Sequence, residues 1–307
     1  MGATLQLVSA ATIFAIILGV TVGIVSALRQ YSALDYTFTF TSFFLYSMPS
    51  FLMGVLLKVF LALGFNNWLQ KPVISWAVII VVSMVIGLFL QAIVRGSWQR
   101  RLLAFGIGTI VCGATMYGMS ATHWFLDPSL GPVLAPLLIA ALGAGMVFLI
   151  AGTRATYAWR TAGATAIVLI VAYFVVSPMM SGLEGWGVVL LFVGAIAVGI
   201  VAGLVLGEHD KGQSARIGAL TGVLGMGVIV FDQFLSRWSD YITNPRINGR
   251  PIATVGSQTP NIQGDWWIQS LDSFTHLLLP TISLMLISFT GYTRYARGGM
   301  LETLNQD

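Results

Sequence analysis

The side chains that most often perform chemistry are few in this chain, and they lie far apart. The three histidines, His123, His209 and His276, lack the H-x3-H and H-E-x-x-H spacings that bring two imidazoles to one zinc ion. The single cysteine, Cys112, excludes an intrachain disulfide and a cysteine-based metal site. No G-x-S-x-G nucleophile elbow occurs. The sequence therefore predicts no catalytic residue, no metal site and no cofactor.

A phosphate-binding loop is also missing from the sequence. The pattern G-x-x-x-x-G-K-[ST] does not occur, and no lysine is followed by serine or threonine. Any ATP hydrolysis that drives this protein must therefore come from another polypeptide. The chain itself is expected to be a conduit and not an enzyme.

The composition is that of a protein embedded in a lipid bilayer. Apolar residues make up 57% of the 307 residues and charged residues only 8%, whereas a soluble domain carries roughly 25% charged residues. The net charge of +4 is interpreted as a topology signal and not as a surface for nucleic acid. We therefore predict an all-α, polytopic transmembrane bundle whose partners include the lipid bilayer and no nucleic acid.

Hydropathy over windows of about 19 residues predicts nine membrane spans. They fall at about 6–28, 37–63, 75–94, 102–120, 132–152, 161–180, 187–207, 217–235 and 276–295. Small residues at i, i+4 in these spans, such as the pairs Gly19/Gly23 and Gly203/Gly207, are interpreted as packing positions.

The connections between the spans alternate in positive charge, which predicts an orientation. The set assigned to the cytoplasm holds ten of the fifteen lysines and arginines: Arg29, Arg95, Arg100, Arg101, Arg154, Arg160, Lys211, Arg216, Arg294 and Arg297. The opposite set holds Lys71, Arg237, Arg246 and Arg250, and three of these lie in one long loop at about 236–275. The N-terminus is thus predicted outside and the C-terminus inside.

Two charged residues lie near the outer ends of predicted spans. Lys58 is interpreted as snorkelling to the outer interface, with a role in a transport pathway as the less favoured alternative. Asp232 is interpreted as solvated at the interface. Arg294 and Arg297, spaced i, i+3 at the inner end of the last span, fit either an inside anchor or a contact with a cytoplasmic partner.

Two blocks of sequence carry a resemblance to a known family. The first reads G-V-T-V-G-I-V-S-A-L-R-Q-Y-S-A-L-D over 19–35 and S-M-P-S-F over 47–51. The second reads H-L-L-L-P-T-I-S over 276–283 and G-Y-T-R-Y-A-R-G-G-M-L-E-T-L-N-Q-D over 291–307. These blocks resemble the B-type membrane subunits of binding-protein-dependent ABC importers for oligopeptides and dipeptides. The resemblance covers about residues 3–72 and 262–307.

The resemblance implies a division of the chain. Residues 1–72 would hold the family's second and third spans, 73–235 a six-span hydrophobic insert, 236–275 an extracytoplasmic loop, and 276–307 a further core span with the start of a cytoplasmic coupling helix. Because six is an even number, the insert returns the chain to the outer side of the membrane. The last core span then crosses from outside to inside, as in the family. We expect the chain to be a piece of a longer permease, with one span missing at the front and about a third of the family architecture missing at the back.

The resemblance also implies site residues and partners. The translocation path would include Ser47, Pro49, Phe51, Pro280 and Ser283. Coupling to the ATPase would involve Arg294, Arg297, Met300, Leu301, Glu302, Leu304 and Asp307. The implied partners are a second permease subunit, two ABC ATPase subunits and an extracytoplasmic substrate-binding protein, in the cytoplasmic membrane of a bacterium.

Short peptides are the cargo that the resemblance implies. The stretch 37–51 fits this cargo because it carries hydroxyl and aromatic side chains and no charged ones. An uncharged lining does not discriminate between peptides of positive and negative charge. A permease for nickel or another small solute is one alternative. A secondary transporter is another, although it would call for ionisable residues near mid-membrane. A lipid-modifying enzyme would need an interfacial cluster of His, Asp or Glu, and the sequence contains none.

Overall fold

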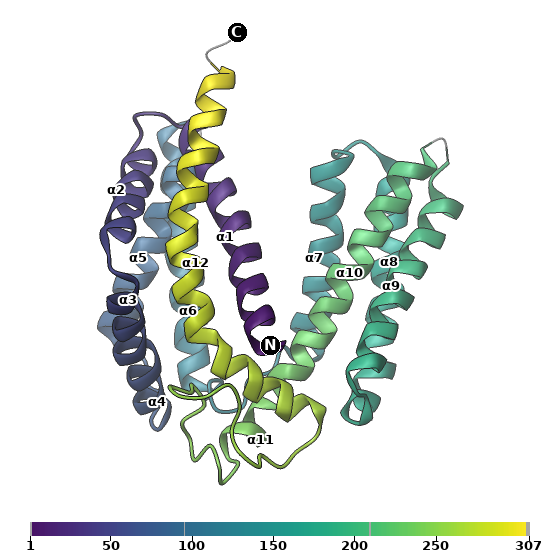
Figure 1. Cartoon of the computed structure of the whole chain (residues 1–307). Coiled ribbons are helices and arrows are strands. Elements are labelled where there is room, and N and C mark those ends of the chain that lie inside the picture. Colours follow the sequence, from purple (N-terminus) through teal and green to yellow (C-terminus); the bar gives the residue numbers. More distant parts are fainter. Residues whose placement is uncertain (1, 95, 209, 305–307) are drawn as a thin grey trace. The chain divides into compact units, whose positions relative to one another are not determined.

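The computed structural model describes residues 2–94, 96–208 and 210–304 (Figure 1). Within these ranges all regular structure is helical, and nine segments are long and apolar enough to cross a membrane. They are Gly2–Leu28, Ser50–Leu69, Trp76–Ile93, Trp98–Ala121, Gly131–Ile150, Thr156–Gly182, Gly185–Leu206, Lys211–Ile242 and Trp266–Leu304. The predicted all-α fold with nine spans is confirmed for the described residues.

The chain forms two compact units. The first contains the residues up to Phe125, Pro245–Pro260 and the residues from Asp272 onward, and the second contains Leu126–Asn244 and Asn261–Leu271. The boundary near residue 125 falls inside the predicted insert. Residues 73–235 are assigned as an insert because they have no counterpart in the family pattern. The division into compact units does not test that assignment, so it stays a prediction.

The first unit is built from α1 and its neighbours in sequence, together with most of α12. Its elements are α1 (Gly2–Leu28), α2 (Ala33–Ser47), α3 (Ser50–Leu56), a π-helix (Leu57–Leu63), α4 (Gly64–Leu69), α5 (Trp76–Ile93), α6 (Trp98–Ala121) and α12 (Trp266–Leu304). Arg29, just after α1, donates hydrogen bonds to the carbonyls of Ala92 and Ile93 at the end of α5. These bonds attach α5 to the α1–α2 turn.

The second unit is a separate helical bundle. Its elements are α7 (Gly131–Ile150), α8 (Thr156–Val176), a 3-10 helix (Ser177–Gly182), α9 (Gly185–Leu206), α10 (Lys211–Ser236) and α11 (Trp238–Ile242). Its core gathers around Ile139, Tyr173, Ile229 and Trp267. The Trp267 indole is fully buried and donates a hydrogen bond of 2.8 Å to the carbonyl of Met180.

The predicted second span, 37–63, is not one continuous helix. α2 ends at Ser47, and Met48 takes an extended backbone with φ −78° and ψ 128°. Pro49 is the cause, because a proline ring clashes with a helical conformation of the residue before it. The membrane-spanning segment therefore begins at Ser50 and not at about 37, and most of the stretch 37–51 lies on the separate helix α2.

The last helix is longer than predicted. α12 has 39 residues, which at 1.5 Å per residue is nearly twice the roughly 30 Å of a bilayer core. It begins at Trp266, inside the predicted outer loop, and continues through the predicted coupling segment to Leu304. Pro280 lies within it and has no N–H to give to the carbonyl of His276, four residues earlier.

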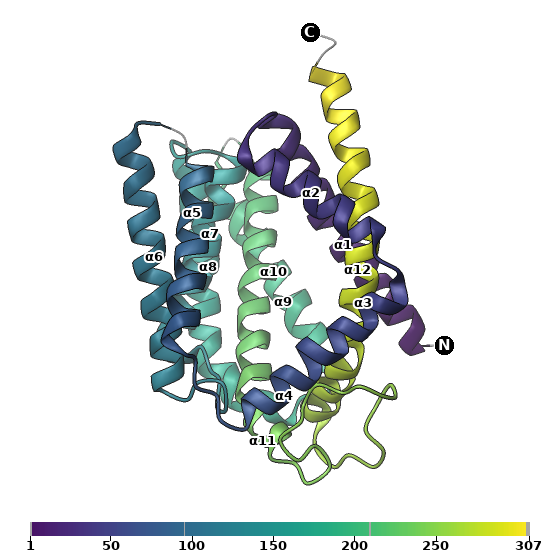
Figure 2. The ribbon, with the colours of Figure 1, turned by 90° about the vertical axis from the view of Figure 1, so that its left-hand side faces the viewer.

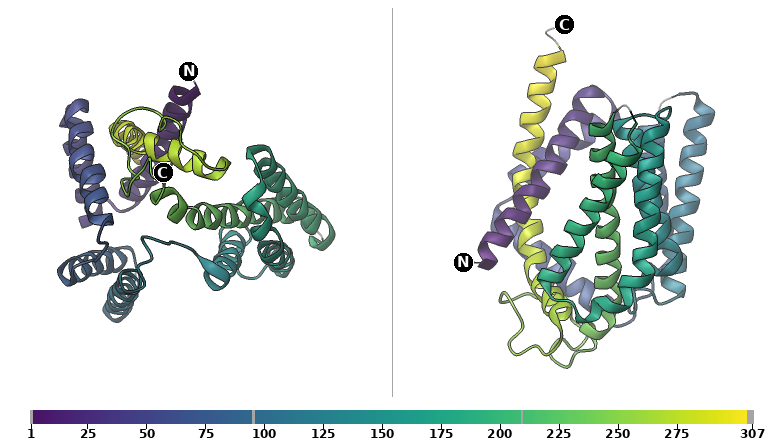
Figure 3. Two further views of the ribbon diagram at one scale, coloured as in Figure 1. Left: turned by 90° about the horizontal axis from the view of Figure 1, so that it is seen from below. Right: turned by 90° about the vertical axis from the view of Figure 1, so that its right-hand side faces the viewer.

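Glycines permit the closest helix contacts in both units. Figures 2 and 3 show α1 crossing α12, and a Cβ added to Gly19 would lie 2.6 Å from Cβ of Tyr292. A Cβ on Gly23 would lie 2.7 Å from the carbonyl oxygen of Thr293. In the second unit, a Cβ on Gly203 of α9 would lie 2.4 Å from backbone atoms of Ala215 on α10. Both predicted small-residue pairs therefore lie at packing contacts.

The interpretation of Asp232 as solvated is wrong. Its carboxylate is on α10 and only 6% of the residue is exposed. It accepts hydrogen bonds from the amide of Leu130 at 2.6 Å and from the hydroxyl of Tyr173 at 2.7 Å. A carboxylate buried in the protein needs such hydrogen-bond partners. The two partner residues lie 102 and 59 positions away in the sequence.

Replacement of Gly203 by leucine should destabilise the protein by about 1–3 kcal/mol, because the new side chain meets the backbone of α10. Gly194→Leu is the matched control, since Gly194 is also on α9 and a Cβ there meets no atom within 4 Å. Thermal unfolding of the purified protein in detergent, followed by tryptophan fluorescence, measures both. Equal losses for the two variants would contradict a close α9–α10 contact at Gly203.

Candidate functional site

A buried carboxylate lies where the end of α1, the start of α2 and α12 meet. Ser32 caps α2, with its hydroxyl accepting from the Asp35 amide at 3.2 Å, so Asp35 is placed in the first helical turn. Asp35 is 3% exposed. A carboxylate near a helix N-terminus is favoured by the helix dipole, and here it also faces a cation.

Arg297 on α12 makes a two-pronged ion pair with Asp35. Its Nε donates to Oδ1 and its Nη2 to Oδ2, both at 3.1 Å. The hydroxyl of Ser26 on α1 and the amide of Tyr31 donate to the same carboxylate, at 2.5 and 3.1 Å. The carboxylate therefore joins three helices, and the fork geometry of arginine fixes their orientation.

The hydrogen bonds determine the charge state of Asp35. Burial is the largest single effect and by itself would raise the pKa of Asp35. The hydrogen bonds from Ser26, Arg297 and the Tyr31 amide, together with the charge of Arg297, outweigh burial and lower the pKa. A carboxyl whose pKa is lower in the folded state stabilises the fold above its unfolded pKa of about 3.9. That contribution is lost only as the pH falls through the lower, folded value, so the pair is intact at neutral pH.

Arg294 lies one turn before Arg297 and contacts aromatic rings of α2. Its guanidinium is 4.6 Å from the ring centre of Tyr46 and 5.9 Å from that of Phe43. Both arginines border a small cavity of about 210 Å³, lined by Ser26, Thr39, Ser42, Phe43, Thr293, Arg294, Arg297 and Gly298. Arg297 is thus bonded within the chain, and Arg294 is exposed beside it.

The other predicted coupling residues lie at the end of α12. Met300 and Leu301 are half-buried, whereas Glu302 and Leu304 are exposed on its last turn. Asp307 lies outside the described residues. The segment is therefore a helical extension that presents a carboxylate and apolar side chains.

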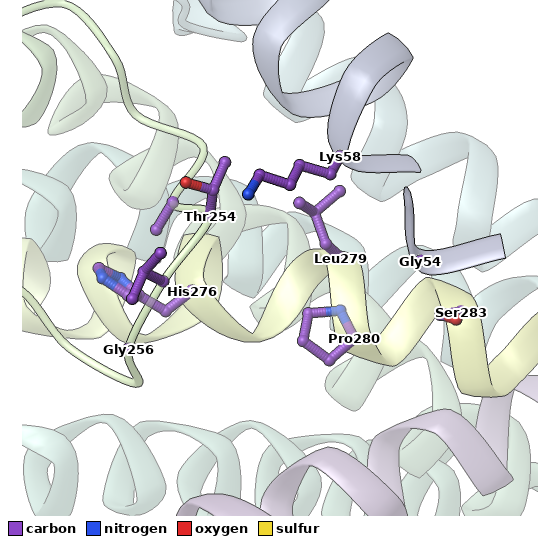
Figure 4. A pocket seen from close by; sticks show the side chains of 10 residues that line it. Gly54, Lys58, Thr254, Gly256, His276, Leu279, Pro280 and Ser283 are labelled. Carbon is purple, nitrogen blue, oxygen red and sulfur yellow. The ribbon is translucent and has the colours of Figure 1, made fainter. Parts of the chain in front are cut away.

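A larger pocket of about 440 Å³ lies elsewhere in the first unit (Figure 4). Its lining comes from α3, the π-helix, one loop and α12, and consists of Gly54, Lys58, Ala253, Thr254, Val255, Gly256, His276, Leu279, Pro280 and Ser283. Two predicted path residues, Pro280 and Ser283, therefore share one pocket. The three others, Ser47, Pro49 and Phe51, lie at the α2–α3 break and do not line it.

Hydrogen bonds to helices hold the loop that lines this pocket at two points, Ile252 and Thr259. The side-chain amide of Asn66 on α4 exchanges two hydrogen bonds with the backbone of Ile252, at 2.9 and 3.0 Å. The carboxylate of Asp272 on α12 accepts from the amide and the hydroxyl of Thr259, at 2.7 and 2.6 Å. Asn66 and Asp272 are both buried, so the loop between these points has a defined position.

Sequence reasoning missed His276 as a pocket residue and gave Lys58 a pathway role only as the less favoured alternative. A lysine within an apolar span and a histidine four residues before a proline were the available signals. In the parts of the chain that the structure describes, no group of three or more His, Cys, Asp or Glu side chains could hold a metal ion.

The fold and these sites define a polytopic helical membrane protein with an ion-paired helix crossing and a pocket between helix and loop. Comparison with known proteins makes the class more specific. The chain is similar to the oligopeptide transport system permease protein OppB of Mycobacterium bovis and of Mycobacterium tuberculosis, with 29% identity over 123 residues. The match covers 38% of this chain and 38% of each relative. No family model matches the chain, and no solved structure matches it.

The similarity confirms the resemblance that the sequence blocks indicated, and the chain resembles a transport permease over part of its length. Because the match spans well under two thirds of these relatives, the activity of a whole transporter is treated below as a proposal.

Removing either partner of the Asp35–Arg297 pair should destabilise the protein by about 1.5–3 kcal/mol, since the remaining group loses charged hydrogen bonds. The double variant Asp35→Ala/Arg297→Ala should lose clearly less than the sum of the single losses. Urea or thermal unfolding in detergent gives the three values, with Arg154→Ala as the control for an exposed arginine outside this crossing. Additive losses would show that the pair contributes nothing beyond its separate contacts.

Proposed function

We propose that this chain is the membrane-spanning permease subunit of an ATP-driven ABC importer that moves short peptides across the cytoplasmic membrane of a bacterium. The observation that carries the proposal is the similarity to OppB over 123 residues. The absence of a phosphate-binding loop from the sequence supports it. A pair of ABC ATPase subunits would supply the energy, a second permease subunit would complete the path, and an extracytoplasmic binding protein would deliver the peptide.

The proposed orientation has the N-terminus outside and the C-terminus inside. The charge bias of the short connections supports it, because positive residues accumulate on the cytoplasmic side. In this orientation the end of α12 that carries Arg294 and Arg297 is cytoplasmic. The pocket at Lys58 and His276 then lies toward the outer side, where peptide arrives.

Cysteine labelling tests the orientation directly, because Cys112 is the only cysteine. In a Cys112→Ala background, Ser257→Cys should react with a membrane-impermeant maleimide in intact cells. Thr303→Cys should react only after the cells are permeabilised. Both positions are exposed in the structure, so burial does not block the reagent. The reverse labelling pattern would refute the proposed orientation.

The ion-paired crossing suggests how ATP-driven movement reaches the path. The segment from Ala296 to the chain's end would dock on an ATPase subunit through Met300, Leu301, Glu302 and Leu304, and the preceding Arg294 would add a further contact. A push on α12 would be carried to α1 and α2 through Arg297 and Asp35, which are bonded at 3.1 Å. Such rigid-body movement between two packings is a common way to switch access. The helices at 73–235 would serve as a scaffold around this core.

The path itself would pass the α2–α3 break and the pocket on α12. Ser47, Pro49 and Phe51 lie at the break, and Pro280 and Ser283 lie in the pocket. Helix breaks suit such a path, because irregular backbone in a membrane is tolerated where it lines a cavity.

Peptide uptake should depend on this gene and on the charge at the end of α12. In a host that needs an amino acid supplied as di- to pentapeptides, deletion should abolish growth on the peptides and the intact gene with its partner genes should restore it. Glu302→Lys should lower uptake about tenfold or more by placing a repulsive charge at the contact. The same variant should fail to co-purify with the ATPase subunit.

Glu184→Lys is the control, since it makes the same change at an exposed glutamate outside the proposed contact segment. Unaltered peptide uptake after deletion of the gene, together with lost uptake of nickel, would overturn the peptide assignment. Normal coupling in the Glu302→Lys variant would overturn the docking segment.

A further inference from the structure

We propose that the pocket between the π-helix and α12 binds the C-terminal end of a peptide, with Lys58 as the partner of its carboxylate. The proposal rests on the proposed function and names the part of the cargo that the chain recognises. The pocket volume of about 440 Å³ lies within the range of small-molecule sites. It suits one or two residues of a peptide and leaves the remainder outside.

Lys58 supplies a positive charge that no described residue neutralises. It lies in the π-helix Leu57–Leu63, a form of helix that occurs frequently at functional sites. Figure 4 shows its side chain extending past Leu279 toward Thr254 on the loop. Among the described residues no carboxylate lies within ion-pair distance of its ammonium group. The ammonium group of Lys58 is therefore available to a ligand.

His276 adds a hydrogen-bonding side chain to the same pocket. Its Nδ1 lies 2.8 Å from the carbonyl oxygen of Asp272, and because a carbonyl only accepts, Nδ1 must carry the proton. In the neutral ring Nε2 is then an acceptor. An ammonium group and an imidazole acceptor that line one pocket match a carboxylate followed by a peptide N–H.

The remaining walls set few limits on the peptide's side chain. Leu279 is apolar, and a Cβ added to Gly54 would meet no atom within 4 Å. The loop is fastened by the Asn66–Ile252 and Asp272–Thr259 bonds, so the site is preformed, which lowers the entropy lost on binding. The pocket would thus recognise the peptide terminus that all cargoes share and tolerate variation in sequence.

Peptide binding is measured on the purified chain without the substrate-binding protein, so that the preferences of that protein do not affect the result. The chain is purified and placed in nanodiscs of phosphatidylcholine, and the probe is tri-alanine with a fluorophore on its amino group, either as the free acid or as the C-terminal amide. The free acid should bind about tenfold more tightly, as one charged hydrogen bond implies. Lys58→Met should remove that difference and Lys58→Arg should retain it.

Lys71→Met is the matched control, because Lys71 does not line the pocket, and it should leave the preference for the free acid unchanged. Thermal unfolding of each variant shows whether it is folded. Equal binding of acid and amide by the unaltered chain, or an unchanged preference in folded Lys58→Met, would overturn the site. Loss of acid binding when phosphatidylserine is added to the nanodiscs would assign the pocket to a lipid headgroup and also overturn it.

The result is separable from that of the uptake experiment. Gene-dependent peptide uptake with no preference for the free acid would leave the importer in place and remove only this site. No gene-dependent uptake would overturn the proposed function itself.

Discussion

The ion pair between Asp35 and Arg297 is the interaction on which the first unit most depends. Lipid provides no hydrophobic force that drives helices together, so close packing and polar bonds must hold them. Gly19 and Gly23 let α1 approach α12, and the arginine fork then sets the orientation of the crossing. Since a buried charge without its partner is strongly unfavourable, this pair opposes any separation of α1, α2 and α12.

Three backbone irregularities of the first unit lie around one pocket. The π-helix, the proline in α12 and the loop near residue 254 all contribute to its lining. In a membrane such backbone persists only where it is covered by protein or reached by water. The loop backbone is hydrogen-bonded by protein groups at two points, through the buried polar side chains of Asn66 and Asp272.

The sequence predicted the helices well and the polar contacts poorly, for a physical reason. Hydropathy detects any segment that is apolar over the thickness of a bilayer, so nine spans could be found from composition alone. The same measure does not detect the break at Met48, where the signal was the proline that follows. The partners of Asp35 and Asp232 were out of reach because Arg297 is 262 positions away and Leu130 is 102 positions away.

The buried carboxylates of this chain and Lys58 differ in their partners. Asp35, Asp232 and Asp272 are all buried, and each accepts hydrogen bonds from several protein groups. Lys58 has no such partner among the described residues, although it lies in a span. An ionised side chain at that position is stable only where water or a ligand reaches it. In the proposed site this access comes from the pocket of about 440 Å³ beside Lys58, which would admit a ligand carboxylate.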